Sequence, residues 1–191
     1  MKFQLAAALA LKSTVASLSP FRTNLPNQGT GNAVSKRLEL SQFHPKPFNL
    51  TSMCVECNKG PQGSSAFDCL IRFHWRDDNA NESGACAESW VWDGVTTAIG
   101  AGNNHSAVYI ICGDQADGGF FQFKFLDFLS LSNFSLSLTH MFRDTEDFST
   151  PTMANLFALA NVTLQPKGQS NGSLSYFADQ PVLATFTGMT I

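Results

Sequence analysis

One stretch of this sequence, from Gly118 to Asp144, alternates apolar and polar residues over most of its length. The apolar residues first occupy odd positions and then even positions, in the order Phe121, Phe123, Phe125, Leu129 and Leu131, then Phe134, Leu136, Leu138 and His140. Strict alternation is typical of a strand with one buried face and one solvated face. Because the phase changes by one residue, we predict a turn or bulge near Ser132–Asn133, between two long antiparallel strands.

Shorter segments with the same alternation lie on both sides of this central pair. The clearest places Phe67, Cys69, Ile71, Phe73 and Trp75 on one face. Further strands are predicted at residues 38–43, 87–92, 107–112, 156–164, 174–177 and 182–187, with a hairpin-like loop at 167–172. A short helix is the alternative for residues 152–160. We predict an all-β domain over residues 38–191, a single antiparallel β-sandwich or barrel of about eight or nine strands.

The N-terminal residues have the composition of a targeting segment. Residues 1–17 combine Lys2, an apolar run and small residues before a cleavage position at Ser17, which predicts a secretory signal peptide. Residues 18–37 lack periodicity and predict a flexible leader or propeptide. The leader ends in Lys36 and Arg37, which form either a dibasic processing site or two solvated charges at a strand start. We therefore expect a secreted, extracellular protein.

Potential N-glycosylation sites agree with passage through the secretory pathway. Six Asn-x-Ser/Thr sequons occur, at Asn49, Asn81, Asn104, Asn133, Asn161 and Asn171. A single sequon arises easily by chance, but six in a chain of this size suit a eukaryotic glycoprotein.

Charge and composition disfavour two classes of partner. The chain has 12 basic and 15 acidic residues, whereas a nucleic-acid-binding domain needs clustered Lys and Arg to neutralise phosphates. It also lacks a run of the roughly 18 apolar residues that a membrane helix requires. We predict neither nucleic-acid binding nor a membrane span. The 17 phenylalanines are enough for one substantial core.

Five cysteines, at positions 54, 57, 69, 86 and 112, allow at most two intramolecular disulfides and leave one thiol. Cys54 and Cys57 form a CxxC pair. A redox CxxC opens a helix in a βαβ unit, and a zinc knuckle needs a second pair of ligands. Neither context is present in the sequence, so we interpret the cysteines as scaffold residues and predict no metal and no cofactor.

The order of cysteines and aromatic strands resembles a known family. The segments are LELSQF, FDCLIRF, CAESWVW, ICGDQADGGFFQFKF and FSLSLTHMF. Over residues 38–164 this pattern resembles small secreted cysteine-containing proteins of filamentous fungi and is similar to the Alternaria major allergen-like domain. The resemblance implies a compact β-barrel or sandwich, and a role as an allergen, effector or elicitor without an established catalytic site.

The same resemblance implies a disulfide pattern. It pairs Cys86 with Cys112, and Cys69 with either Cys54 or Cys57. We favour Cys57 with Cys69 because this pair closes the shorter loop. Cys54 is then expected in an exposed loop, where it stays unpaired or joins two chains into a homodimer.

Three groups of residues carry side chains that catalysis uses, but none forms a coherent site. Residues 168–172 match G-x-S-x-G, yet a nucleophile elbow needs a helix after the serine and a histidine downstream, and the last histidine precedes it. Two acidic groups, in which paired carboxylates would suit glycoside hydrolysis, are interpreted as solvated turn charges: Asp114 and Asp117, and Asp144, Glu146 and Asp147. The remaining candidates, His74, His140, Trp75, Trp90 and Trp92, are interpreted as structural residues.

We therefore expect a secreted non-catalytic interaction protein, a fungal effector or allergen-like protein that binds an unknown host protein or cell-wall component. The alternative is a carbohydrate-binding or carbohydrate-active cell-wall protein. Exposed tryptophans in a groove beside two carboxylates would favour the alternative, and buried tryptophans without a pocket would favour the first function.

Overall fold

A computed structural model describes residues 44–60, 64–95, 97, 105, 107–114, 119–145, 153–170 and 172–191. All of them belong to one compact unit, Ser35–Ile191. The predicted signal peptide, the leader and the strand at residues 38–43 lie outside the described residues.

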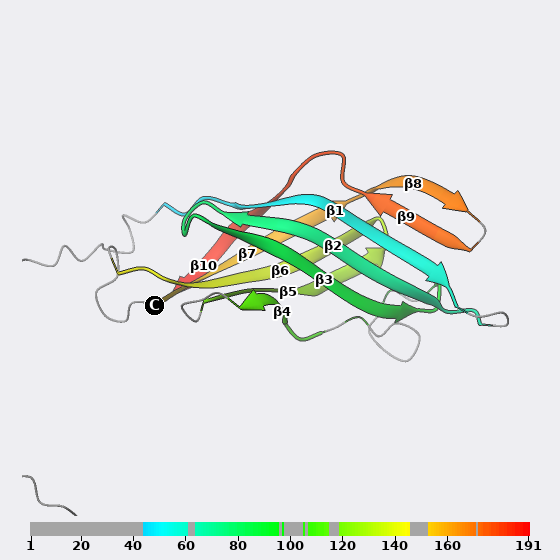
Figure 1. Cartoon of the computed structure of the whole chain (residues 1–191), viewed down its shortest axis with the longest axis horizontal. Coiled ribbons are helices and arrows are strands. Elements are labelled where there is room, and N and C mark those ends of the chain that lie inside the picture. Colours follow the sequence, from blue (N-terminus) through cyan, green and yellow to red (C-terminus); the bar gives the residue numbers. More distant parts are fainter. Residues whose placement is uncertain are drawn as a thin grey trace, which may run out of the picture. The chain divides into compact units, whose positions relative to one another are not determined.

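The described residues form ten strands and no helix, which confirms the all-β prediction. The strands are β1 (Phe48–Lys59), β2 (Phe67–Asp77), β3 (Glu82–Trp92), β4 (Ile110–Asp114), β5 (Phe120–Ser130), β6 (Asn133–Arg143), β7 (Met153–Thr163), β8 (Gln165–Ser170), β9 (Ser173–Phe177) and β10 (Val182–Thr190). Figure 1 shows them along the chain. Within the described residues no helix is long and apolar enough to cross a membrane.

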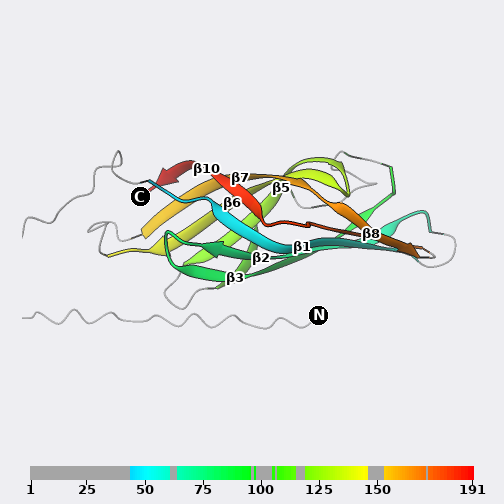
Figure 2. The same cartoon turned by 90° about the horizontal axis from the view of Figure 1, so that it is seen from above.

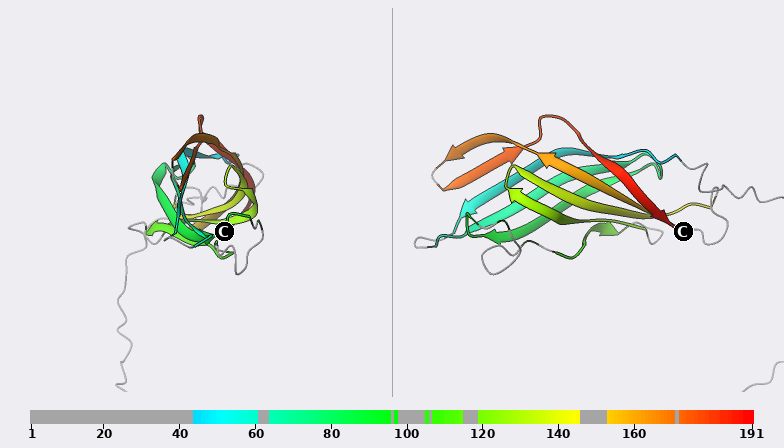
Figure 3. Two further views of the ribbon diagram at one scale, coloured as in Figure 1. Left: turned by 90° about the vertical axis from the view of Figure 1, so that its right-hand side faces the viewer. Right: turned by 180° about the vertical axis from the view of Figure 1, so that it is seen from behind.

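Eight strands form one antiparallel sheet in the order β3-β2-β1-β10-β7-β6-β5-β4. The two end strands, β3 and β4, contact each other, and the disulfide Cys86–Cys112 joins them. The sheet therefore curls into a nearly closed barrel, which is seen end-on in Figure 3. The strands β1, β2 and β3 run side by side (Figure 2). The remaining two strands form a hairpin in which β9 pairs with both β8 and β1.

The central pair of strands is confirmed, but the phase change lies earlier than expected. β5 and β6 pair along their length around the turn at Leu131–Ser132. The register already shifts within β5, between Phe125 and Asp127. As a result Phe128 is buried, with 5% exposure, whereas Leu129 is 64% exposed. The expectation that Leu129 belongs to the buried face is wrong, because a bulge moves the following side chains to the other face.

Three local predictions are also corrected. The helix that was the alternative for residues 152–160 is wrong for residues 153–160, where strand β7 begins at Met153 and buries every second side chain, as the predicted strand at 156–164 requires. The segment 167–172 belongs to a hairpin as expected, formed by β8 and β9, but residues 167–170 are part of strand β8 and not of a loop. The Cys54–Cys57 segment is not a loop either, because both residues lie within β1.

Aromatic rings fill the interior of the barrel. Trp75 stacks on Phe121, with ring centroids 4.2 Å apart, and Phe73 meets Phe123 edge to face at 5.1 Å. Fully burying one such side chain stabilises a fold by about 1.5–3 kcal/mol. The many phenylalanines are thus explained by a core in which rings from β2 pack against rings from β5, on the other side of the barrel.

Candidate functional site

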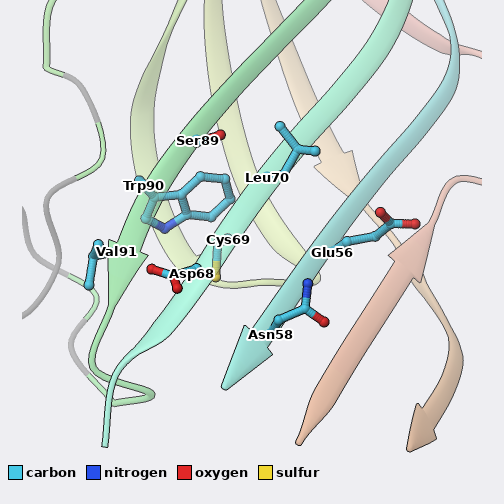
Figure 4. Close-up of a pocket in the computed structure, with 8 residues that line it drawn as sticks. All are labelled: Glu56, Asn58, Asp68, Cys69, Leu70, Ser89, Trp90 and Val91. Carbon is cyan, nitrogen blue, oxygen red and sulfur yellow. The ribbon is translucent and has the colours of Figure 1, made fainter. Parts of the chain in front are cut away.

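A groove lies on the outer surface of β1, β2 and β3, with a volume of about 370 Å³ (Figure 4). We call it the outer groove. Its outward-facing side chains come from two rows that cross the three strands, because the register aligns alternate residues. The rows are Glu56, Leu70 and Ser89, and Asn58, Asp68 and Val91. The groove therefore offers two carboxylates, an amide, a hydroxyl and two aliphatic side chains.

Cationic side chains continue the outer face of β2 beyond the groove. The Arg72 guanidinium donates a 2.8 Å hydrogen bond to Glu56, and the two side chains are 50% and 40% exposed. A hydrogen bond to the Cys54 side chain, followed by electrostatic interactions with Cys54 and with the Glu56 carboxylate, raises the pKa of Arg72 above its ordinary value. Further along, the hydrogen bond from Arg76 lowers the pKa of Asp78. The face is thus acidic in the groove and mixed beside it.

The tryptophans do not line the groove with their rings. Trp90 borders it, but the residue is only 4% exposed and its ring packs in the core against Phe125 at 5.3 Å. Trp75 is 2% exposed, and the half-buried Trp92 packs against Phe67. Stacking on a sugar requires an accessible ring face. The combination that would favour carbohydrate recognition, exposed tryptophans beside two carboxylates, is therefore absent for Trp75 and Trp90. The opposite combination, buried tryptophans without a pocket, is met only in its first half, because the outer groove is present.

A second polar cluster lies inside the barrel, and we call it the buried trio. His140 on β6 bonds through Nδ1 to Asp77 Oδ2 at 2.7 Å and through Nε2 to Glu82 Oε2 at 2.9 Å. The side chains of His140 and Asp77 are completely buried, and that of Glu82 is 25% exposed. The trio joins the last residue of β2 and the first residue of β3 to β6, which lies on the opposite side of the barrel in the sheet order.

Further hydrogen bonds connect the trio, through the turn between β2 and β3, to residues at the surface. Asp77 Oδ1 accepts hydrogen bonds from the backbone N–H and the side-chain amide of Asn79, at 2.8 and 2.6 Å. The backbone N–H of Lys46 in turn donates to Asn79 Oδ1 at 2.7 Å, and the Asn79 amide donates to the Lys46 carbonyl. The β2–β3 turn and the segment that leads into β1 are thereby connected to His140.

The cysteine pairs found are those that the sequence analysis favoured. Disulfides join Cys57 to Cys69 and Cys86 to Cys112, and Cys54 forms no disulfide. Cys54 is half-buried on the strand β1, opposite Arg72, rather than in an exposed loop. The alternative pairing of Cys69 with Cys54 is wrong because alternation points Cys54 and Cys57 to opposite faces of β1.

The sequon asparagines differ in accessibility. Asn81, Asn133 and Asn161 are exposed, and the side-chain oxygen of Asn49 is buried without a hydrogen-bond partner. Asn133 lies opposite Thr163 in the register of β6 and β7, and Ser135 lies opposite Asn161, so two sequons lie side by side. The other two, Asn104 and Asn171, lie outside the described residues.

The remaining candidates are not brought together. Ser170 ends β8 and the chain returns as the strand β9, so the helix of a nucleophile elbow does not follow. Asp114 ends β4, Asp144 follows β6 and His74 is exposed on β2. The acidic residues Asp117, Glu146 and Asp147, like Lys36 and Arg37, lie outside the described residues.

The buried trio was only partly foreseen. His140 was interpreted as structural. Asp77 was not among the candidate residues, although it lies on the apolar parity of its strand with Phe73 and Trp75. A carboxylate on a buried face needs a partner, and this was the available signal. Glu82 carried no such signal, because it lies before the strand segment that the alternation marked.

Comparison with known proteins assigns no family. No protein-family model matches the chain, and no match is found among curated protein sequences.

Proposed function

We propose that this chain is a secreted non-catalytic interaction protein, of the fungal effector or allergen-like kind, that recognises its partner through the outer groove. Two disulfides agree with an oxidising, extracellular environment. The observation that carries the proposal is the division of roles between the two faces of β1–β3. The inner face is packed with aromatic rings, and the outer face presents a polar groove.

The chemistry of the groove favours a partner with basic and small polar groups. Asp68, and Glu56 by the lone pairs that Arg72 leaves open, can accept charge-assisted hydrogen bonds from a partner, and Asn58 and Ser89 can add neutral ones. Leu70 and Val91 supply the apolar contact that a host protein or a cell-wall component would cover. Carbohydrate binding is the other candidate, and the buried tryptophans weigh against it.

Glycans on the accessible sequons would leave this face open. Asn133 and Asn161 lie on β6 and β7, which are separated from β1 by β10 in the sheet order. We propose that these two asparagines and Asn81 are glycosylated, and that Asn49 is not, because its side-chain oxygen is buried. Cys54 remains the residue through which two chains would be joined, and such a homodimer would bring a second copy beside the groove.

The test is binding of the purified secreted protein to extracellular host proteins and to cell-wall polysaccharides. The double variant Glu56→Gln/Asp68→Asn removes the two groove charges, and Asp179→Asn removes an exposed charge in the loop before β10. We expect the groove variant to bind a protein partner roughly tenfold or more weakly, since charge-assisted hydrogen bonds contribute about 1.5–3 kcal/mol, and the control to bind normally. Equal binding by both variants contradicts the groove as the site. Hydrolysis or tight binding of a polysaccharide would support the alternative instead.

A further inference from the structure

The buried trio forms two hydrogen bonds and needs one hydrogen for each. A neutral histidine and two ionised carboxylates carry only one such hydrogen between them. A bond of 2.7–2.9 Å between two polar atoms needs one hydrogen between them, and an ionised carboxylate has none to give. A neutral imidazole supplies a hydrogen from one nitrogen only. We propose that Asp77, His140 and Glu82 form a buried proton-binding site, and that folding of the barrel takes up one proton there.

Two arrangements satisfy both bonds. Either an imidazolium lies between two carboxylates, or a neutral imidazole lies between one carboxylic acid and one carboxylate. Each arrangement holds two hydrogens and has a net charge of −1. With one hydrogen fewer, a ring nitrogen and a carboxylate oxygen face each other as two acceptors in a site without water around His140. Buried polar groups without a partner are strongly destabilising, so the folded state retains the second hydrogen.

The side chains around His140 are aromatic or aliphatic, so the protonation of the trio is governed by its own three groups. His140 is faced by Phe48 from β1, Trp75 from β2, Phe121 from β5 and Phe142 from β6, at ring-centroid distances of 5.0–6.3 Å. Its register partner on β7 is Leu156. The charged groups facing it from these elements and from β3 are Asp77 and Glu82. Among the described residues the one other buried titratable side chain is His105, which packs against Phe125 and Phe128.

The sign of the effect follows from proton linkage. In an unfolded chain a histidine loses its proton near pH 6.5, so between about pH 7 and 9 the three groups together hold one hydrogen. The folded trio holds two. Because the folded state binds one proton more, the equilibrium constant for unfolding rises about tenfold per pH unit in this range. Below about pH 6.5 the unfolded histidine is also protonated, and this contribution to the slope disappears.

The proton also acts on the edge of the barrel. Asp77 uses one oxygen for His140 and the other for Asn79, which holds Lys46. Loss of the proton breaks one of the two hydrogen bonds of His140, to Asp77 or to Glu82, which lie at the two ends of the β2–β3 turn, and so loosens the link between that turn and β6. This makes the barrel most stable in neutral to mildly acidic surroundings.

The variant Glu82→Gln tests the proposal without emptying the site. The amide of the new side chain can donate to His140 Nε2, while Nδ1–H donates to Asp77, so both bonds form with a single imidazole hydrogen. Urea unfolding of the full chain, with its disulfides intact, is measured from pH 6 to 9. We expect the unfolding constant of the wild type to rise about 100-fold more than that of Glu82→Gln between pH 7 and 9. The matched control Glu56→Gln, in an exposed ion pair, should keep the wild-type slope. Equal slopes for the wild type and Glu82→Gln overturn the proposal.

A second measurement uses the wild-type protein alone and decides the question even if the variant does not fold. Nitrogen and carbon NMR signals of His140, Asp77 and Glu82 at pH 8 count the hydrogens of the trio directly. Two hydrogens, on both ring nitrogens or on one nitrogen and one carboxyl, support the proposal. One N–H with two ionised carboxylates overturns it.

Discussion

Charged residues occur in two contrasting settings in this barrel, the buried trio and the exposed pair Arg72–Glu56 beside the outer groove. The hydrogen-bond lengths are nearly the same, at 2.7–2.9 Å in the trio and 2.8 Å in the pair. The difference is water. Around His140 no solvent replaces a lost partner, whereas both members of the surface pair are about half exposed. Stability should therefore depend on the trio, and recognition can use the surface charges at little structural cost.

The largest expected effect comes from removing the centre of the trio. His140→Ala leaves two carboxylates near each other in the core, and breaking a buried charged network typically costs about 3–5 kcal/mol. That is a large part of the 5–15 kcal/mol that stabilises an ordinary domain. Equilibrium urea unfolding at pH 7 measures it, and His74→Ala, at an exposed position on β2, is the matched control. A loss below about 1 kcal/mol for His140→Ala would remove the contrast between the two settings.

A smaller effect is expected where the trio borders the aromatic core. A Cβ added at Gly84 would lie 2.9 Å from Trp75 Nε1, and the Trp75 ring is 5.0 Å from that of His140. Gly84→Ala must therefore displace a ring that stacks on Phe121, at a cost of about 1–3 kcal/mol. Gly168→Ala is the control, since nothing lies within 4 Å of its added Cβ. Equal unfolding midpoints for the two variants would show that the core near the trio is not tightly packed.

The contrast also explains what the sequence could predict. Alternation identifies the buried faces of β2, β6 and β7 correctly, because the period of a strand is a local property. The bulge after Phe125 escapes this logic, since an extra residue is defined only by the strand that pairs with it. Leu129 was placed on the wrong face for that reason.

The buried trio depends on even longer-range information. The burial of His140 and Asp77 can be read from their parity, but their meeting requires β2 and β3 to lie across the barrel from β6. The outer groove has the same origin, because its two rows exist only once three strands pair in register. Closure of the sheet, with β3 against β4, is not encoded in any single segment.

The smallest expected effect on stability comes from breaking the surface pair Arg72–Glu56. It is the direct test of the contrast between exposed and buried charges. Glu56→Gln removes the charge that Arg72 contacts, yet water can solvate both side chains, so the urea midpoint should stay within experimental error of the wild type. The measurement is repeated at pH 6 and pH 9, where the difference between the variant and the wild type should be the same. A decrease as large as that of Gly84→Ala would mean that the outer face of β1–β3 contributes to folding. If the midpoint is unchanged, any loss of partner binding by Glu56→Gln alone reflects recognition at the groove, because that substitution leaves the barrel intact.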